Sequence, residues 1–245
     1  MPNPPDSHVR LQKIVDEHFS QHPFASGITK ANVADLLANY LAMSQAFPYL
    51  QAGAQRDVIH ACIRDNRGVP AAFEITSVVG NFLAWDETGG NYILRRFGVE
   101  GLPRILETTQ NFHANHLRRD IRALLDRDVE PEFSPETRDY LLRLSEALAH
   151  DDPQVRCATM VSFELHAAQM IGALWESLVG LYAVEPDSLS YFRMHLGGAD
   201  PAEPYHVAMT CEMIERLVPA REWSGFERHF VDAYRMHFDW CAEIS

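Results

Sequence analysis

Residues 158–175 read ATMVSFELHAAQMIGALW, and this stretch decides the fold. It belongs to a longer segment, 153–181, that is rich in Ala, Met and Leu and contains few charged residues. A helix that is apolar around most of its circumference is normally buried, so the segment predicts a central helix. Glu164 lies in its middle, where a carboxylate is costly to bury without a cation or strong hydrogen bonds. We therefore expect Glu164 to have a buried partner, either a salt bridge or a metal ion.

Helical spacing of apolar residues continues on both sides of this segment. Ser134-Pro135-Glu136 is an N-cap followed by proline at the first helical position, which starts one further helix. The run 73–85 contains β-branched residues, but its length and its neighbours favour a helix over a strand. Besides 153–181, we expect helices over 29–51, 73–85, 102–127, 134–150, 187–195, 202–217 and 222–241, with loops at 65–70 and 128–134.

This pattern, with no internal repeat and no linker, predicts a single all-α domain over residues 1–245. The expected architecture is a bundle of about seven helices with a ligand site between facing helices.

Composition limits the partners of the chain. Its 245 residues are 47% hydrophobic and carry a net charge of −13, which argues against a nucleic-acid-binding or anionic-membrane-binding surface. No apolar run is long enough to cross a bilayer and the first residues lack a secretory signal, so we expect a cytoplasmic protein. The four cysteines are far apart, which predicts buried thiols. A small-molecule ligand and a homodimer are the expected associations.

The stretch YFRMHLGGADPAEPYH, residues 191–206, gathers four groups that can bind a metal. Glu203 and His206 are three residues apart and share one face of a helix, a common arrangement for holding iron. The Gly-Gly pair permits the chain to fold back so that His195 joins them, and Asp200 lies in the same break. The alternative is a solvated Glu203 and a hydrogen-bonded His206.

A second acidic pair, Asp86 and Glu87, ends an apolar helix in LAWDETGGN, residues 83–91. Negative charge at a helix C-terminus is unfavourable with respect to the helix dipole. A bound cation would offset this cost, and so would exposure to solvent.

Several ordered motifs resemble the heme-oxygenase-like diiron oxidases, which include the chlamydial para-aminobenzoate-forming CADD protein and nitrile-forming cyanobacterial relatives. TenA and PqqC proteins are similar more distantly, in fold. The resemblance covers nearly the whole chain and implies two Fe(II) ions that activate O2. It places ligands at Glu87, Glu164, His195, Glu203 and His206. The motifs are AFPYL (46–50), WDETGG (85–90), SFE (162–164) and SYF…H (190–195) leading to ExxH (203–206).

Two departures from that family bear on the metal site. The usual closing motif is HxxxDxxH, whereas His195 and Glu203 are eight residues apart, so Asp200 competes with Glu203 as a ligand. The family also places a histidine three or seven residues after the first glutamate, where this chain has Gly90 and Leu94.

The nearest replacements for that histidine are His113 and His116, three residues apart. Three alternatives follow. One of these histidines replaces the missing ligand, or one metal ion binds tightly and the other weakly, or the chain has lost the oxidase activity. Their simpler interpretation is as surface or hydrogen-bonded histidines.

The resemblance implies oxidation of a small amino-acid-derived substrate, by N-oxygenation, C–C cleavage or nitrile formation, with electrons from an unidentified donor. Mixed carboxylate and imidazole ligation with open positions suits iron(II). The alternatives are a metal-free TenA-like cofactor-biosynthesis enzyme and a non-catalytic binding protein. Candidates to line an apolar pocket are Tyr40, Phe47, Trp85 and Trp175, and candidates to hold a substrate carboxylate are Arg95 and Arg118.

Overall fold

The computed structural model describes residues 6–185, 188–200 and 202–245, and the regular elements in these ranges are all helical. This confirms the all-α prediction. The helices are α1 (Asp6–His18), α2 (Phe24–Gly27), α3 (Val33–Arg64), α4 (Ala71–Glu87), α5 (Gly90–Phe97), the 3-10 helix η1 (Val99–Leu106), α6 (Thr108–Asn111), α7 (His113–Leu125), α8 (Pro135–Leu148), α9 (Pro153–Tyr182), α10 (Ser190–His195), α11 (Glu203–Leu217), the 3-10 helix η3 (Ala220–Glu222) and α12 (Trp223–Glu243).

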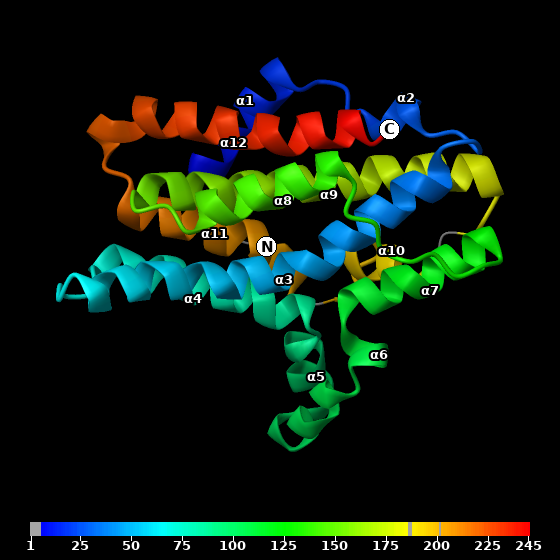
Figure 1. Cartoon of the computed structure of the whole chain (residues 1–245), viewed down its shortest axis with the longest axis horizontal. Helices are drawn as coiled ribbons and strands as arrows, with labels where there is room; N and C mark the ends of the chain where they lie inside the picture. The colour runs from blue at the N-terminus through cyan, green and yellow to red at the C-terminus, as the bar shows by residue number, and fades with distance from the viewer. Residues whose placement is uncertain (1–5, 186–187, 201) are drawn as a thin grey trace.

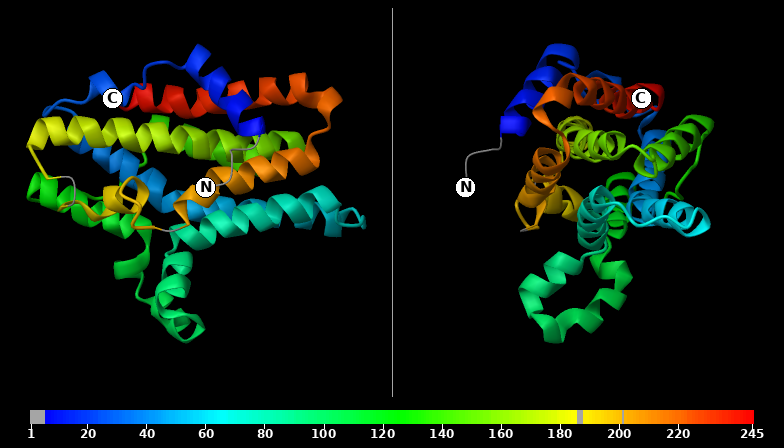
Figure 2. Two further views of the ribbon diagram at one scale, coloured as in Figure 1. Left: turned by 180° about the vertical axis from the view of Figure 1, so that it is seen from behind. Right: turned by 90° about the vertical axis from the view of Figure 1, so that its left-hand side faces the viewer.

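Helix α9 is the centre of the bundle, as its apolar sequence predicts. It runs through the middle of the molecule in both orientations and packs against α12, α11, α2, α8, α4 and α10 (Figures 1 and 2). Every residue from Arg156 to His166 is buried. Burying so much apolar surface is the main favourable term in folding, so α9 organises the helices that contribute to the site.

The prediction of one helix over 102–127 is wrong. The chain instead forms η1, the single turn α6 and then α7, which begins at His113. The side-chain amide of Asn111 donates to the carbonyls of Arg104 (2.7 Å) and Glu107 (3.2 Å), and Phe112 is extended with ψ 126°. These bonds compete with a continuous helix, and they set His113 in the first turn of α7.

Other helix boundaries also differ from those expected. Helix α3 continues past 51 to Arg64, with Pro48 in its interior. The helix expected over 187–195 begins at Ser190, and position 187 lies outside the described residues. Helices α1, α2 and α5 fall outside the expected ranges, and together with α6, which comes from the division of 102–127, they bring the number above the expected seven. The Ser134 cap is as predicted, since its hydroxyl accepts the Thr137 N–H at 3.3 Å.

Helix α5 and η1 form an arm that projects from the bundle and returns through α6 to α7 (Figures 1 and 2). The arm leaves the bundle at the end of α4 and comes back at the start of α7. Its two ends therefore place the carboxylates of α4 beside the histidines of α7. Within the described ranges, the length and hydropathy of the helices fall short of what a membrane span needs.

Three buried histidines make stability dependent on pH. His22 Nε2 lies 3.2 Å from His166 Nε2, and the ring centroid of His237 lies 5.6 Å from that of His166. Burial lowers the pKa of His22 to about 4, lowers that of His237 to about 3, and lowers that of His166 well below its ordinary value. Between about pH 4 and 6.5 the unfolded chain binds more protons at His22, so stability is lost as the pH falls.

We predict that His22→Asn flattens the dependence of unfolding free energy on pH in this window by up to ~1.4 kcal/mol per pH unit. Urea denaturation between pH 7 and pH 4.5 measures the slope. The same substitution at His60, which is exposed on α3, is the control and leaves the slope unchanged. An equal slope in wild type and His22→Asn would contradict a neutral, buried His22.

Candidate metal centre

The Gly89-Gly90 pair brings the end of α4 close to the start of α7. Gly89 has φ +84°, and a Cβ there would lie 2.5 Å from the carbonyl oxygen of Asn111. A Cβ on Gly90 would lie 2.1 Å from the ring of Trp85. Only glycine suits a positive φ with so close a backbone neighbour. Asn111 is two residues before His113, so this contact positions His113 against the last turn of α4.

We predict that Gly89→Ala destabilises the protein by about 2 kcal/mol, because it adds backbone strain and a clash with Asn111. Gly98→Ala is the matched control, since Gly98 also has a positive φ (+67°) but has no atom within 4 Å of an added Cβ. The control carries only the strain. Chemical denaturation measures both, and an equal loss in the two variants would mean that the Asn111 contact is unimportant.

Glu87, His113 and His195 form a first cluster of metal-binding groups. Each offers one ligand atom, and these atoms lie within 4.8 Å of one another. His113 Nδ1 is 3.4 Å from Glu87 Oε2, and the His113 side chain is fully buried. The three residues come from the ends of α4 and α10 and from the first turn of α7. We refer to them as the His113 cluster.

Asp86, Glu203 and His206 form a second cluster, and their ligand atoms also lie within 4.8 Å of one another. His206 Nε2 is 2.7 Å from Asp86 Oδ2, and the Asp86 side chain is fully buried. Helix α11 begins at Glu203, so Glu203 and His206 stand one turn apart on it as expected. We refer to these residues as the His206 cluster.

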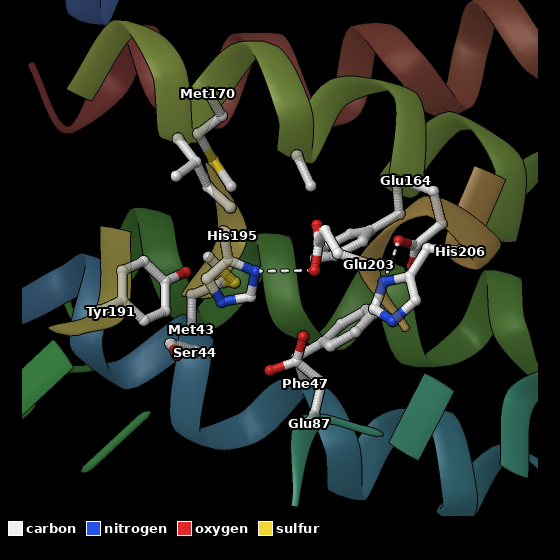
Figure 3. A pocket seen from close by; sticks show the side chains of 13 residues that line it. Met43, Ser44, Phe47, Glu87, Glu164, Met170, Tyr191, His195, Glu203 and His206 are labelled. Atoms are coloured by element: carbon white, nitrogen blue, oxygen red, sulfur yellow. Dashed lines mark hydrogen bonds and ion pairs between the residues drawn. The ribbon is translucent and has the colours of Figure 1, made fainter. Parts of the chain in front are cut away.

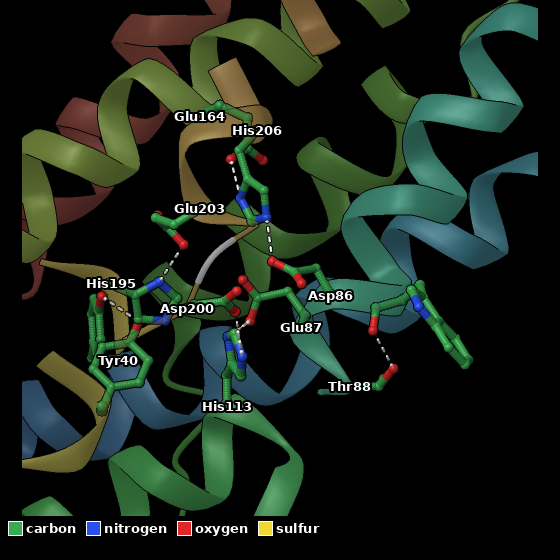
Figure 4. A network of polar contacts seen from close by, with 12 residues as sticks. Tyr40, Asp86, Glu87, Thr88, His113, Glu164, His195, Asp200, Glu203 and His206 are labelled. Atoms are coloured by element: carbon green, nitrogen blue, oxygen red, sulfur yellow. Dashed lines mark hydrogen bonds and ion pairs between the residues drawn. The ribbon is translucent and has the colours of Figure 1, made fainter. Parts of the chain in front are cut away.

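Three further contacts join and flank the two clusters (Figure 4). His195 Nδ1 lies 3.1 Å from Glu203 Oε2, which links one cluster to the other. Glu164 Oε2 lies 3.1 Å from His206 Nδ1, so Glu164 has the buried partner that its position on α9 predicts. Asp200 Oδ2 lies 3.5 Å from His113 Nε2, while Asp200 Oδ1 accepts the N–H of Ala202 at 2.8 Å.

Buried polar atoms without hydrogen-bond partners concentrate here, and this observation fits a site that can bind cations. Buried polar groups are normally paired, and each exception calls for an explanation such as an ion. Among the described residues, the unpartnered buried atoms at this site are Asp86 Oδ1, His113 Nδ1 and Nε2, Glu164 Oε1, His195 Nε2 and Asp200 Oδ2. Carboxylate oxygens and imidazole nitrogens within 4.8 Å of one another are the donor set of a mixed oxygen and nitrogen metal site.

The carboxylates of the centre favour the protonated, positively charged form of its histidines. Burial alone would lower the pKa of His113, but the carboxylates of Glu87 at 3.4 Å and Asp200 at 3.5 Å raise it to about 10. Against the same effect of burial, Glu164 and Asp86 raise the pKa of His206 well above its ordinary value. Burial opposes ionisation of Glu87 too, yet the charge of His113 lowers its pKa to about 2. A metal ion binding here would release the imidazole protons.

The structure brings most of the sequence-predicted ligands together. Glu87, Glu203, His195 and His206 belong to the two clusters, and Glu164 and Asp200 contact cluster histidines. Glu203 rather than Asp200 completes a cluster, and of the two candidate histidines on α7 it is His113 that belongs to one. His116 lies outside both clusters and lines a separate pocket.

Asp86 is half of an acidic pair in the sequence, but it is not among the expected ligands. The pair Asp86-Glu87 offers two carboxylates, but the motif resemblance carries only Glu87 into the site. The side chains of neighbouring helical residues point about 100° apart. Asp86 and Glu87 would therefore bind metal ions at two different positions around the end of α4. The signal that was available is the charge itself, at the end of an apolar helix.

A pocket opens beside the clusters; it measures about 400 Å³ including its open mouth, and only about 30 Å³ inside (Figure 3). Helices α3 and α9 supply its apolar wall, which includes Phe47, Phe163 and Met170, and the centre supplies its polar end. Phe47 and Phe163 stack with centroids 3.8 Å apart. The lining contains no Arg, Lys or Cys among the described residues.

Phe47 lines the pocket as expected. The other residues expected there do not: Tyr40, Trp85, Trp175, Arg95 and Arg118. Tyr40 lies behind the pocket residue Tyr191, with their hydroxyls 3.1 Å apart. Trp85 is 37% exposed, and Trp175 packs on Phe192. Arg95 stacks over the ring of Tyr205, and Arg118 pairs with Glu130.

Comparison with known proteins identifies the fold. No family model and no curated protein matches the sequence. A solved structure from Nostoc punctiforme, described as a CADD-like protein of unknown function, matches with a TM-score of 0.68 and 14% sequence identity. The match covers 96% of this chain and 96% of that chain. At this identity the likeness shows the fold alone, which is the all-α fold of a CADD-like protein along nearly the whole chain.

Proposed function

We propose that this protein is a non-heme diiron oxidase that activates O2 to oxidise a small amino-acid-derived substrate. The carrying observation is the pair of three-residue clusters, in which Asp86, His113 and His195 have buried atoms without hydrogen-bond partners. A mixed carboxylate and imidazole set with open positions is typical of iron(II) sites that bind O2. When bound, the irons would supply the redox chemistry that no side chain here supplies.

Each cluster would hold one iron. Glu87, His113 and His195 provide one oxygen and two nitrogen donors, whereas Asp86, Glu203 and His206 provide two oxygen donors and one nitrogen donor. The two sites are therefore chemically unequal, and the site richer in carboxylates would favour the more highly charged ion.

Outside the clusters, two carboxylates have positioning roles. Glu164 fixes the ring of His206 through Nδ1, and Asp200 faces Nε2 of His113. Such partners orient imidazole ligands and raise their basicity. Glu164 Oε1 and Asp200 Oδ2 could themselves coordinate a cation, since neither atom has a hydrogen-bond partner.

The pocket bears on the substrate class. Its wall of apolar residues on α3 and α9 excludes water from the reacting group, and Ser44 and Tyr191 provide hydroxyls. Apart from the cluster histidines His195 and His206, no basic side chain lines it among the described residues, so no arginine or lysine is available to pair with a substrate carboxylate. An amine-bearing substrate with an apolar body suits this lining better than one held by its carboxylate.

Titration of anaerobic, metal-free protein with Fe(II), followed by exposure to O2, tests the proposal. We expect two irons per chain and a transient charge-transfer absorbance after O2 is added. Oxygen consumption with apolar amino acids and amines then separates an enzyme from a binder. Failure to bind iron would overturn the proposal and favour a metal-free enzyme or a binding protein of the same fold.

A further inference from the structure

A second pocket lies between the projecting arm and the bundle, and we propose that it binds a small organic anion through a phosphate or carboxylate group. Its residues come from α5, η1, α6, α7 and α10, and it measures about 930 Å³ including its open mouth. It shares no lining residue with the apolar pocket of the candidate metal centre. The inference does not depend on the proposed function.

The pocket concentrates positive charge in a chain whose net charge is −13. Arg96, Arg104 and Arg193 line it, together with a single acidic residue, Glu107. In the described part of the chain, no carboxylate lies within 4.0 Å of any of these three guanidinium groups. Three arginines that line one cavity with a single carboxylate give it a net positive charge, which favours an external anion.

Aromatic residues hold two of these arginines in place before any ligand arrives. Arg96 Nη1 donates to the Tyr92 hydroxyl at 2.7 Å, and its guanidinium lies 5.5 Å from the centroid of the Phe97 ring. The guanidinium of Arg104 lies 4.3 Å from the same ring centroid. Cation–π contacts of this kind restrain both side chains around one ring. Less rotamer entropy is then lost when a ligand binds.

The opposite wall supplies the third arginine and a neutral polar group. Arg193 lies on α10, and His116 lies on α7 with a buried Nδ1 that has no hydrogen-bond partner. Burial, with help from Arg119 and His113, lowers the pKa of His116 to about 4, so this imidazole is neutral at pH 7. It can therefore donate one hydrogen bond without adding a charge.

A planar guanidinium fork matches the oxygens of a carboxylate or a phosphate, and both chemistries remain open here. The cavity is of the size that encloses small molecules, which favours a free organic anion over a macromolecule. Arg193 and His116 belong to the helices that carry His195 and His113. An anion bound between them would contact the metal-binding helices on the side away from the apolar pocket.

Isothermal titration calorimetry of metal-free protein, with inorganic phosphate and succinate as probes in low-salt buffer, tests this site. We expect one saturable site, and the tighter probe identifies the phosphate or the carboxylate source. Arg104→Gln and Arg193→Gln should each weaken binding at least about tenfold, the usual effect of losing a charge-assisted hydrogen bond. Arg138→Gln, at an exposed arginine of α8, should leave binding unchanged.

Circular dichroism confirms that each variant is folded, and Arg104 on the arm provides a test far from the core if Arg193→Gln unfolds. The proposal is overturned if neither probe binds wild type, or if Arg104→Gln binds as tightly as Arg138→Gln. Because this titration uses metal-free protein, its result does not depend on iron binding. A failure to bind either anion would overturn this proposal alone, and a failure to bind iron would overturn the proposed function alone.

Discussion

Asp86→Asn and Glu87→Gln will each lower the iron content of the protein from two ions per chain to one, although the two residues are adjacent. The reason is that they serve different clusters, Asp86 with His206 and Glu87 with His113. An amide keeps the shape of the carboxylate but loses its charge, so it is a much weaker ligand for a hard cation. The double variant should bind no iron at stoichiometric concentration.

Iron content after anaerobic loading and desalting, measured by elemental analysis, gives the result directly. Glu74→Gln is the matched control, because Glu74 lies on the same helix but is exposed. It should retain two ions. If Asp86→Asn binds as much iron as wild type, then the His206 cluster is not a metal site and the diiron interpretation is wrong.

The second large effect concerns the metal-free protein. His206→Ala should lower its free energy of unfolding at pH 7 by about 3–5 kcal/mol, the usual loss when one partner of a buried ion pair is removed. The imidazole lies between Asp86 and Glu164, whose side chains are 0% and 5% exposed. Without it, each of these two carboxylates stays buried and loses the imidazole that pairs with it.

Urea denaturation in the presence of a chelator measures this loss. His116→Ala provides the comparison, because His116 is partly buried but contacts no carboxylate of either cluster. We expect it to lose at most about 1 kcal/mol. Similar losses in the two variants would show that the carboxylates of the metal-free centre do not depend on His206 for their charge balance.

The same residues show how far the site could be predicted. Glu203 and His206 are neighbours on α11 because three residues make nearly one helical turn, and that relation requires no tertiary structure. Glu164 needed a buried partner because of its apolar surroundings in the sequence, and His206 is that partner. The identity of the partner was not predictable from α9 itself.

Two features of the centre lay beyond local reasoning. Periodicity continued the helix through 102–127, but the bonds of the Asn111 side chain to Arg104 and Glu107 end it and let α7 begin at His113. These competing local structures differ by only a few hydrogen bonds. Spacing alone therefore gave no choice between His113 and His116, whereas the contact of Gly89 with Asn111 favours His113.

By itself, the sequence determined the all-α fold, the central position of α9 and the pairing of Glu203 with His206, because each follows from helical periodicity and the cost of burying polar groups. Only the tertiary structure decided that Asp86 and Glu87 serve separate clusters and that His113 completes one of them. Those choices depend on how the end of α4 packs against α7 and α11, and contacts between residues so distant in sequence leave no periodic signal in the chain.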